Sequence, residues 1–332
     1  MIIFAVFSDV LLGTGSFVFR DFGLFGYPLA HHFRESFWRG EIPLWNPLNN
    51  CGLPFLAQWN TMVCYPGSII YLALPLPWSL NLFCLLHLLL AGVTMYFLAL
   101  RWTESRFAAS VAGLAFAFSG TVLGTLIWPN YIAVLAWMPA VILCCERAWL
   151  EGGRRLLIAG LIGAMQMLAG APELIFFTWL IVLVLWVDQW WQRTSSRATL
   201  TRRFLAVVAL VTGLSAVQLF PFLDLLLHSH RNTQSDTDAW SMPFSGLANC
   251  LVPLFRTHQL PAGVHFQQDQ RCLSSIYGGI GVMALALWAL VRTRQRRVWL
   301  LGAMLLVSTW LSLGDKGHLY NWLRQAIPSA NF

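Results

Sequence analysis

Charge is scarce in this chain. Asp, Glu, Lys and Arg together make up 11% of its 332 residues, whereas hydrophobic residues make up 58%. A soluble domain of this length would carry roughly twice that charged fraction. Apolar runs of about 17–25 residues, long enough to cross a bilayer as helices, recur along the chain. The sequence therefore predicts an all-α polytopic membrane protein and argues against a soluble domain and a β-barrel.

Three other features are missing from the sequence. No CxxC pair or His/Cys cluster has zinc-site spacing, so we expect no bound metal, although a need for a divalent cation stays open. The 21 basic residues, which set the net charge of +7, lie in short segments between apolar runs rather than on a soluble face. We therefore expect no nucleic-acid partner. No internal repeat is visible of the kind that pairs broken helices in many transporters.

The apolar runs predict nine membrane spans in a single transmembrane domain over residues 1–332. The stretch 66–77 is apolar but short and bracketed by prolines, so we expect a re-entrant or interfacial segment there. The first run contains Asp9 and lacks a basic region and a small-residue cleavage site, so we expect no cleaved signal peptide. The predicted spans are 2–19, 79–100, 107–127, 131–148, 155–170, 173–191, 204–226, 273–291 and 298–313.

Arginine placement predicts the orientation of these spans. Thirteen of the 21 basic residues lie in four short segments that follow the second, fourth, sixth and eighth spans. The positive-inside rule makes those segments cytoplasmic, with the N-terminus inside and the C-terminus outside. The two long polar loops, 20–66 and 227–272, then face the exterior. The thirteen residues are Arg101, Arg106, Arg147, Arg154, Arg155, Arg193, Arg197, Arg202, Arg203, Arg292, Arg294, Arg296 and Arg297.

Four cysteines fall in the two outward loops. An oxidising exterior permits one or two disulfides among them. Cys51–Cys64 and Cys250–Cys272 are the local pairings, among three possible connectivities.

Asp21 stands out among the polar residues of the outward side. It lies beside Arg20 at the outer end of the first span, where a carboxylate can reach a lipid-borne group and act as a general base. The alternative is an interfacial ion pair with Arg20 that only ends the span.

The segment after Asp21 has helical apolar spacing, which predicts an amphipathic helix on the outer surface. Its polar face can bind phosphate through arginine, or it can be a solvated face. Tryptophans in the loop are interface aromatics or platforms for sugar rings. The candidate substrate-binding residues of this loop are Arg20, His31, His32, Arg34, Glu35, Trp45 and Asn46.

Further polar groups lie at the outer ends of later spans. Glu173 belongs to the tight turn 170–173, where the alternative is a carboxylate that complements a helix N-terminus. Gln218 and Asp224 mark a kinked outer end of the seventh span, and they belong either to a site or to the wet rim of a helix. The remaining candidate substrate-binding residues are Glu173, Gln218, Asp224, Arg231 and Arg271.

The stretch GEIPLWNPLNNCGLPFLAQWNTMVCYP (40–66) resembles the YfhO-like bacterial membrane proteins. Those carry a Gly-x-(Leu/Ile)-Pro-Leu-Trp-Asn-Pro run, then Gly-x-Pro-Phe and Tyr-Pro. Upstream, Asp21, Tyr27 and Pro28 resemble an Asp, Tyr and Pro pattern of that family. AGAPELIFF (169–177) resembles its Ala-Gly-His-Pro-Gln turn, with Ala171 and Glu173 in place of the His and Gln. QLFPFLDLLLHSHR (218–231) and SIYGGIGVMALAL (275–287) resemble later segments.

That family resembles the GT-C glycosyltransferases, which are multi-span enzymes that use polyprenyl-phosphate sugars. The resemblance implies a GT-C-like fold in the bacterial cytoplasmic (inner) membrane. It also implies an inverting transfer from a polyprenyl-phosphate sugar donor to an extracytoplasmic glycan, lipid or protein acceptor. Asp21 would be the catalytic base, and Arg20, Arg231 and Arg271 are candidates to stabilise the leaving lipid phosphate. Family members are usually longer, so a truncated gene, a fragment and a short variant stay open.

Two alternatives to a transferase remain. One is a transporter or flippase of lipid-linked glycan, and the other is a non-catalytic assembly partner. A transporter is expected to place ionisable groups in the middle of the membrane. Here only Asp9 and His87 are plausible mid-span ionisable groups. This small number modestly favours chemistry at the membrane surface over transport.

Overall fold

The computed structural model describes residues 2–17, 20–192, 196–229, 241–259, 265–268, 275–320 and 322. Within them the chain is almost entirely helical, so the prediction of an all-α membrane helical bundle is confirmed. The chain divides into two compact units. Unit 1 comprises Met1–Ala117 and Thr125–Ser229, and unit 2 comprises Phe118–Gly124 and His230–Phe332.

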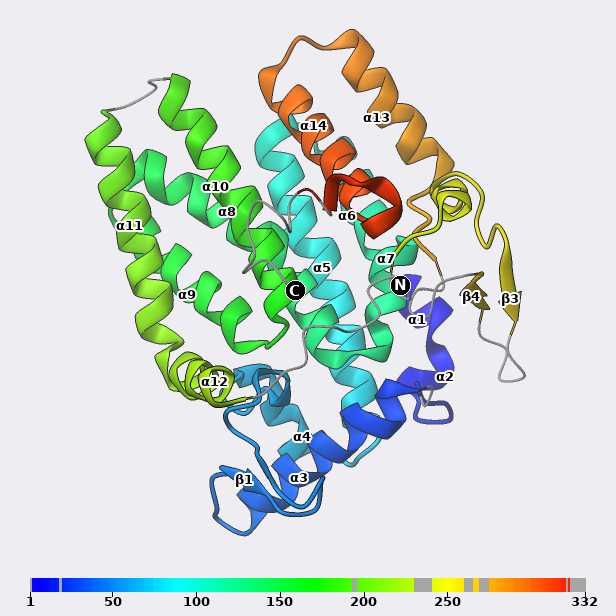
Figure 1. Cartoon of the computed structure of the whole chain (residues 1–332), viewed down its shortest axis with the longest axis vertical. Helices are drawn as coiled ribbons and strands as arrows, with labels where there is room; N and C mark the ends of the chain where they lie inside the picture. Colours follow the sequence, from blue (N-terminus) through cyan, green and yellow to red (C-terminus); the bar gives the residue numbers. More distant parts are fainter. Residues whose placement is uncertain are drawn as a thin grey trace. The chain divides into compact units, whose positions relative to one another are not determined.

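Unit 1 is a bundle of long helices in which α8 (Pro129–Glu151) is the common neighbour (Figure 1). In the most apolar 18 residues of α8, 67% are buried inside the protein. Its packing partners come from before and after it in the sequence, so most of the unit's core forms around this one helix. They are α5 (Trp78–Thr103), α9 (Arg154–Leu168), α10 (Pro172–Gln192) and α11 (Arg197–Leu214), while α6 (Arg106–Ala117) packs on α5.

Small residues and buried hydrogen bonds hold these helices together. Gly113 of α6 lies so close to α5 that an added Cβ would stand 2.7 Å from the carbonyl oxygen of Gly92. Thr94 Oγ1 of α5 donates a hydrogen bond of 2.8 Å to the carbonyl oxygen of Ala136 in α8. Close backbone approach and interhelical hydrogen bonds stabilise helix pairs in lipid, where the surroundings are as apolar as the side chains.

Short elements gather at one end of unit 1, at the bottom of Figure 1. The predicted amphipathic segment is the helix α3 (Tyr27–Trp38), and its apolar face packs inside the protein, with the Phe33 and Tyr71 rings 6.0 Å apart. Strands β1 (Trp45–Asn46) and β2 (Leu53–Pro54) form an antiparallel pair. The other elements of the unit are α1 (Ile2–Val6), α2 (Ser8–Leu11), η1 (Phe22–Gly26, a π-turn), η2 (Trp59–Thr61), η3 (Pro66–Ile69), α4 (Ile70–Ala73), η4 (Thr125–Ile127) and α12 (Ala216–His228).

Unit 2 combines two helices with a small hairpin. Its helices α13 (Ile280–Arg292) and α14 (Arg296–Leu311) contain no buried residue. The antiparallel strands β3 (Thr257–Gln259) and β4 (His265–Gln267) pair His258 with Phe266. The unit also contains α7 (Gly120–Gly124), η6 (Phe244–Cys250) and η7 (Gly314–Gly317).

The predicted count of nine spans is not confirmed. Within residues 2–17, the described part of the first predicted span, the chain forms only the short helices α1 and α2, because glycines follow Asp9 and Gly13 takes a φ of +77°. The segment 204–226 breaks at Ser215, whose hydroxyl hydrogen-bonds back to the Val211 carbonyl, and α11 and α12 meet there at 80°. Four described helical segments are long and apolar enough to cross a membrane, with a fifth if that bent pair is one span: Trp78–Thr103, Arg106–Ile127, Pro129–Glu151 and Pro172–Gln192.

The predicted Cys51–Cys64 pairing is absent from the structure, where both residues are free thiols. Cys51 is exposed and Cys64 is half-buried. The Cys250–Cys272 pairing falls on Cys272, which lies outside the described residues.

Gly170 offers a test of the packing between the loops of unit 1. It has a φ of +81°, and an added Cβ would collide with the backbone carbonyl of Trp59. Gly153 has a similar φ of +59° but open space around it. Gly153→Ala should therefore cost only the strain of its positive-φ backbone, about 1–3 kcal/mol. Gly170→Ala adds a clash with backbone and should lower the thermal unfolding temperature in detergent clearly further. Equal losses in the two variants would contradict the close approach.

Candidate active site at the start of helix α8

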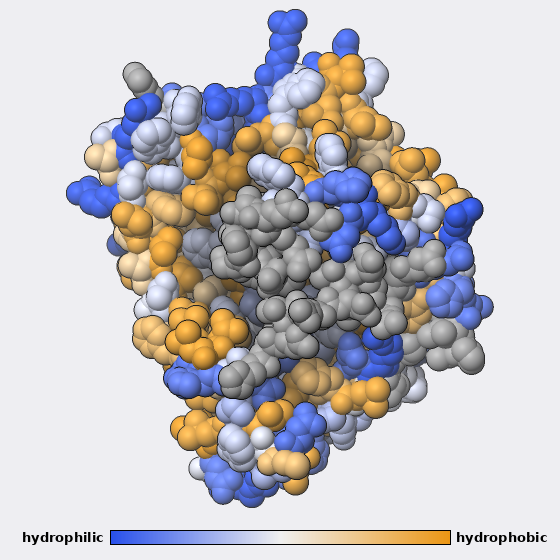
Figure 2. Space-filling model, viewed as in Figure 1, coloured by the Kyte–Doolittle hydropathy of each residue, from blue (hydrophilic) through white to orange (hydrophobic). Residues whose placement is uncertain are grey.

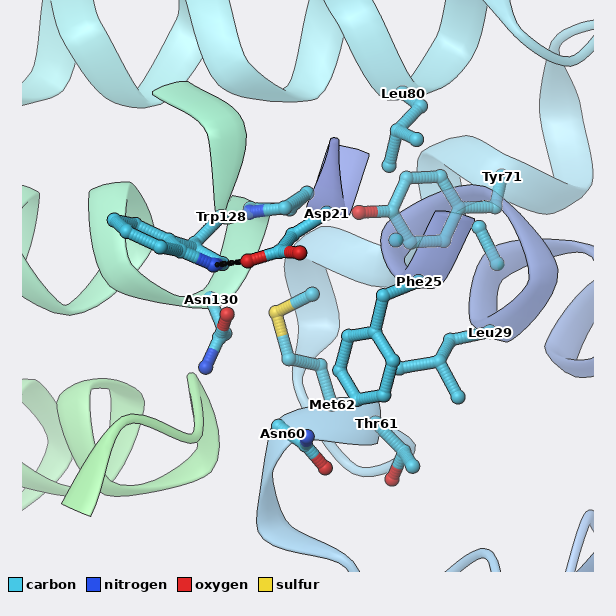
Figure 3. Close-up of a pocket in the computed structure, with 13 residues that line it drawn as sticks. Asp21, Phe25, Leu29, Asn60, Thr61, Met62, Tyr71, Leu80, Trp128 and Asn130 are labelled. Atoms are coloured by element: carbon cyan, nitrogen blue, oxygen red, sulfur yellow. Dashed lines mark hydrogen bonds between the residues drawn. The ribbon is translucent and has the colours of Figure 1, made fainter. Parts of the chain in front are cut away.

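Asp21 is held by a tryptophan from the start of the most buried helix. Trp128 Nε1 donates a hydrogen bond of 2.6 Å to Asp21 Oδ2 (Figure 3). Trp128 comes directly before α8, where Pro129 occupies the first helical turn and sets its direction. Among the described residues, no hydrogen bond reaches Asp21 Oδ1. The carboxylate is therefore oriented through Oδ2.

A cleft runs beside this carboxylate. It is small, with a cavity volume of about 20 Å³, roughly the room for one water molecule, and it opens to solvent. Most of its wall is apolar, and a few amide and hydroxyl groups stand among these side chains, a composition typical of ligand sites. Its lining includes Asp21, Phe25, Leu29, Asn60, Thr61, Met62, Tyr71, Leu80, Trp128 and Asn130.

Tyr71 contributes an unexpected polar group to the cleft. Its side chain is 2% exposed, and its hydroxyl is buried and has no hydrogen-bond partner. Figure 3 shows this hydroxyl pointing toward Asp21. Burial raises the pKa of Tyr71 well above its ordinary value of 10, so the phenol stays protonated at neutral pH. A buried donor without an acceptor is costly, so this hydroxyl is suited to an oxygen of a ligand.

The start of α8 also binds a second carboxylate, which belongs to Glu173 of α10. The Tyr131 hydroxyl donates a hydrogen bond of 3.3 Å to Glu173 Oε2, and the Trp128 and Tyr131 rings lie 5.4 Å apart. Glu173 is exposed in the first turn of α10, where it also complements the helix dipole. The first turn of α8 thus links Asp21 and Glu173 through two adjoining aromatic side chains.

Two predicted substrate-binding residues are engaged inside the protein. Gln218 is fully buried, and its Nε2 donates a hydrogen bond of 2.6 Å to the Leu56 carbonyl. Asn46 is 7% exposed, and its Oδ1 accepts a hydrogen bond of 3.0 Å from the Leu48 amide. Both side chains hold the backbone of the 20–66 loop, and neither lines the Asp21 cleft.

The predicted residues of α3 and β1 form a separate hollow. His31, His32, Glu35 and Trp45 line a space between α3 and residues 41–48. The Arg34 guanidinium instead stacks on Trp38, 3.9 Å from the ring centroid.

The other predicted residues lie apart from the cleft or cannot be placed. Asp224 forms an exposed pair with His228 at 3.3 Å and lines neither space. Arg20 precedes Asp21 with a φ of +45°. Arg231 and Arg271 lie outside the described residues. Within the described part of the chain, no group of three His, Cys, Asp or Glu residues could hold a metal ion.

Sequence reasoning missed Tyr71 and Trp128. Tyr71 is the aromatic residue of the apolar segment 66–77, and Trp128 stands directly before a proline that begins a helix. Each is a signal of a fixed aromatic, but neither indicates which distant residue it meets. Trp128 and Asp21 are separated by 107 positions in the chain.

His32 makes the stability of this region depend on pH. The pKa of His32 lies below its ordinary value of 6.5, chiefly because the ring is buried and also because Arg39 and His31 are close, although a hydrogen bond to the Trp45 backbone opposes this. His32 therefore binds a proton less readily in the folded state than in the unfolded state. The free energy of unfolding then falls as the pH drops below about 6.5. His32→Asn should reduce this loss, whereas His31→Asn at the exposed neighbour should keep most of it. Unfolding temperatures in detergent at pH 7.5 and 5.5 measure the effect. An equal acid loss in the two variants would contradict the assignment.

Comparison with known proteins gives one family match, which extends over the segments that form the site. A family model described as bacterial membrane protein YfhO matches residues 1–314, which include the Asp21 loop and all of α8. Neither a curated protein nor a solved structure matches the chain. Because the family match extends over most of the sequence, the chain belongs to the YfhO family of bacterial membrane proteins.

Proposed function

We propose that this protein is a membrane glycosyltransferase that moves a sugar from a polyprenyl-phosphate donor to an extracytoplasmic acceptor, with Asp21 as the general base. The observation that carries the proposal is the position of Asp21. One of its oxygens is held by Trp128, and the residue lines a cleft with a mostly apolar wall. A base needs this combination of fixed orientation and access to the proton that it removes.

In the proposed reaction, the acceptor hydroxyl gives its proton to Asp21 Oδ1. The acceptor oxygen forms a bond to the anomeric carbon of the donor sugar, with inversion at that carbon. The bond from this carbon to the phosphate oxygen breaks, and the lipid phosphate leaves with the electron pair. The Tyr71 hydroxyl is suited to donate a hydrogen bond to a substrate oxygen beside Asp21. Arg20, Arg231 and Arg271 remain the proposed partners of the phosphate.

The two ends of α8 support an extracytoplasmic cleft. Asp21 lies at the start of α8, and Glu151 at its end is paired with one arginine of the same helix and two arginines of α5 and α9. The helix has 23 residues, so its ends are about 33 Å apart, which matches the thickness of a bilayer core. Arginines at one end favour the cytoplasm by the positive-inside rule, and the cleft at the other end would then face outward. The arginines are Arg101, Arg147 and Arg155, at 3.9, 3.3 and 3.0 Å from Glu151.

Transport receives less support, because the mid-span histidine is fully engaged. The Tyr65 hydroxyl lies 2.6 Å from His87 Nε2, and His87 Nδ1 lies 2.7 Å from the Phe83 carbonyl oxygen. Trp137 Nε1 donates a hydrogen bond of 2.8 Å to the same Tyr65 hydroxyl. With both ring nitrogens bonded inside the protein, His87 ties the first loop to α5 rather than offering a site to a moving ion.

Asp21→Asn tests the base directly, since it keeps the shape of the side chain and removes the proton acceptor. Loss of a general base typically lowers a rate by about 10²–10⁴-fold. We expect Asp21→Asn to accumulate normally in the membrane, bind the polyprenyl-phosphate sugar, and transfer it at least about a hundredfold more slowly. The measurement is turnover of that donor by purified protein.

Asp224→Asn is the matched control, because Asp224 is an exposed carboxylate whose ion pair lies outside the cleft. It should transfer at the parental rate. Parental transfer by Asp21→Asn would place the base elsewhere. Failure of Asp21→Asn to accumulate would make Asp21 a structural residue and remove the main support for catalysis.

A further inference from the structure

A second concave space lies beside α3, away from the Asp21 cleft. One of its walls is the polar face of α3, with His31, Glu35 and Arg39, and the other is the segment from Glu41 to Leu48. Its cavity volume is about 700 Å³, so it is the roomier of the two spaces. Its lining mixes charged, aromatic and aliphatic side chains, so it is neither a simple apolar groove nor a charged patch.

Trp45 provides a fixed aromatic surface in this hollow. The residue belongs to β1, where it pairs with Pro54, and its indole packs against Gly52 so tightly that a Cβ there would stand 2.5 Å from the ring. Gly52 also has a φ of +108°, which favours glycine. The indole nevertheless stays 55% exposed. A rigid, open aromatic ring of this kind offers large contact area to a ligand at little entropic cost.

The charges of the hollow favour a neutral ligand rich in hydroxyl groups. Glu35 and Glu41 supply two carboxylates against the single guanidinium of Arg39, which is already 3.4 Å from Glu41. An excess of carboxylate repels phosphate and anionic lipid headgroups. The same carboxylates are strong acceptors for hydroxyl donors, and the open aromatic ring suits the apolar C–H face of a sugar.

His32 supplies an independent sign of an unfilled site. It lines the hollow, its side chain is only 8% exposed, and its Nε2 is buried without a hydrogen-bond partner. Buried polar nitrogens in folded proteins are almost always satisfied. A ligand hydroxyl that reaches Nε2 from the hollow would satisfy this nitrogen.

We propose that the hollow between α3 and residues 41–48 binds carbohydrate, with Trp45 as the stacking platform and Glu35 as a hydrogen-bond acceptor. Its further assignment to the glycan acceptor rests on the proposed transferase function. His32 follows Asp21 by eleven residues along helical chain, which corresponds to about 16 Å. One sugar ring cannot contact both, so the hollow holds a distal part of an extended glycan whose reacting end lies at Asp21.

Aliphatic side chains at the rim of the hollow define the competing outcome. Ile42, Leu44 and Leu48 are 65%, 58% and 86% exposed. Figure 2 shows hydrophobic and hydrophilic residues side by side in this region, at the bottom of the view. Such a rim can also rest on a bilayer surface. The experiment therefore also measures partitioning of the protein to anionic vesicles.

The test measures binding of two neutral oligosaccharides, chitotetraose and maltotetraose, to the purified full-length protein by saturation-transfer NMR. We expect at least one to bind, and Trp45→Ala to weaken that affinity roughly tenfold or more. Trp38→Ala is the matched control, because Trp38 is a tryptophan of similar exposure, 57%, at the end of α3 but lies outside the lining of the hollow. It should bind like the parent. Glu35→Gln should also weaken binding, and it covers the case in which Trp45→Ala does not fold.

Three outcomes would overturn the proposal. The first is no binding of either oligosaccharide at millimolar concentration, and the second is an equal loss of sugar affinity in Trp38→Ala and Trp45→Ala. The third is a Trp45→Ala protein that partitions less to anionic vesicles but binds sugar like the parent. Asp21→Asn should bind the oligosaccharide like the parent. If sugar binding survives while parental and Asp21→Asn proteins transfer alike, the catalytic role of Asp21 fails and the carbohydrate site stands. If transfer requires Asp21 but no oligosaccharide binds, the carbohydrate site fails alone.

Discussion

The hydrogen bond from Trp128 to Asp21 is the contact on which the site depends, because it joins the first loop to the most central helix. The same helix start fixes neighbouring segments through Tyr131, which meets Glu173, and through Asn130, whose amide donates a hydrogen bond of 2.8 Å to the Gly170 carbonyl. A carboxylate on a free loop would sample many orientations. Attached to the end of a buried helix, it has one.

A membrane protein must satisfy its polar groups internally or place them at its ends. Unit 1 does both. Some polar side chains buried by its long helices are hydrogen-bonded across the bundle, as Thr94 is to the Ala136 carbonyl. The exposed polar chemistry lies at the two ends of α8, with Asp21 at one and the arginines around Glu151 at the other. Opposite ends of different character would give the proposed transferase the fixed direction across the bilayer that transfer on one side requires.

The sequence predicted what local pattern determines. Long apolar runs located α5, α8 and α10 to within a few residues, and apolar spacing located α3. The count of nine spans is not confirmed, and local detail modifies the hydropathy pattern at Ser215, where a hydroxyl bonds back into the helix and the chain bends. The residues that surround Asp21, Gln218 and Tyr71 could not be predicted, since these contacts join residues far apart in the chain. Asp21 itself was singled out because an acidic residue at the end of an apolar run is conspicuous, and its catalytic role stays a prediction.

The side of the membrane on which the Asp21 end lies is the claim to test most directly. Cys51 is an exposed free thiol in the turn between β1 and β2, at that end of unit 1. A variant that keeps Cys51 alone should react with a membrane-impermeant maleimide in intact cells. A cysteine placed instead at the exposed Glu104, which ends α5, should react only after the cells are permeabilised. Reaction of Cys51 only after permeabilisation would contradict an extracytoplasmic site.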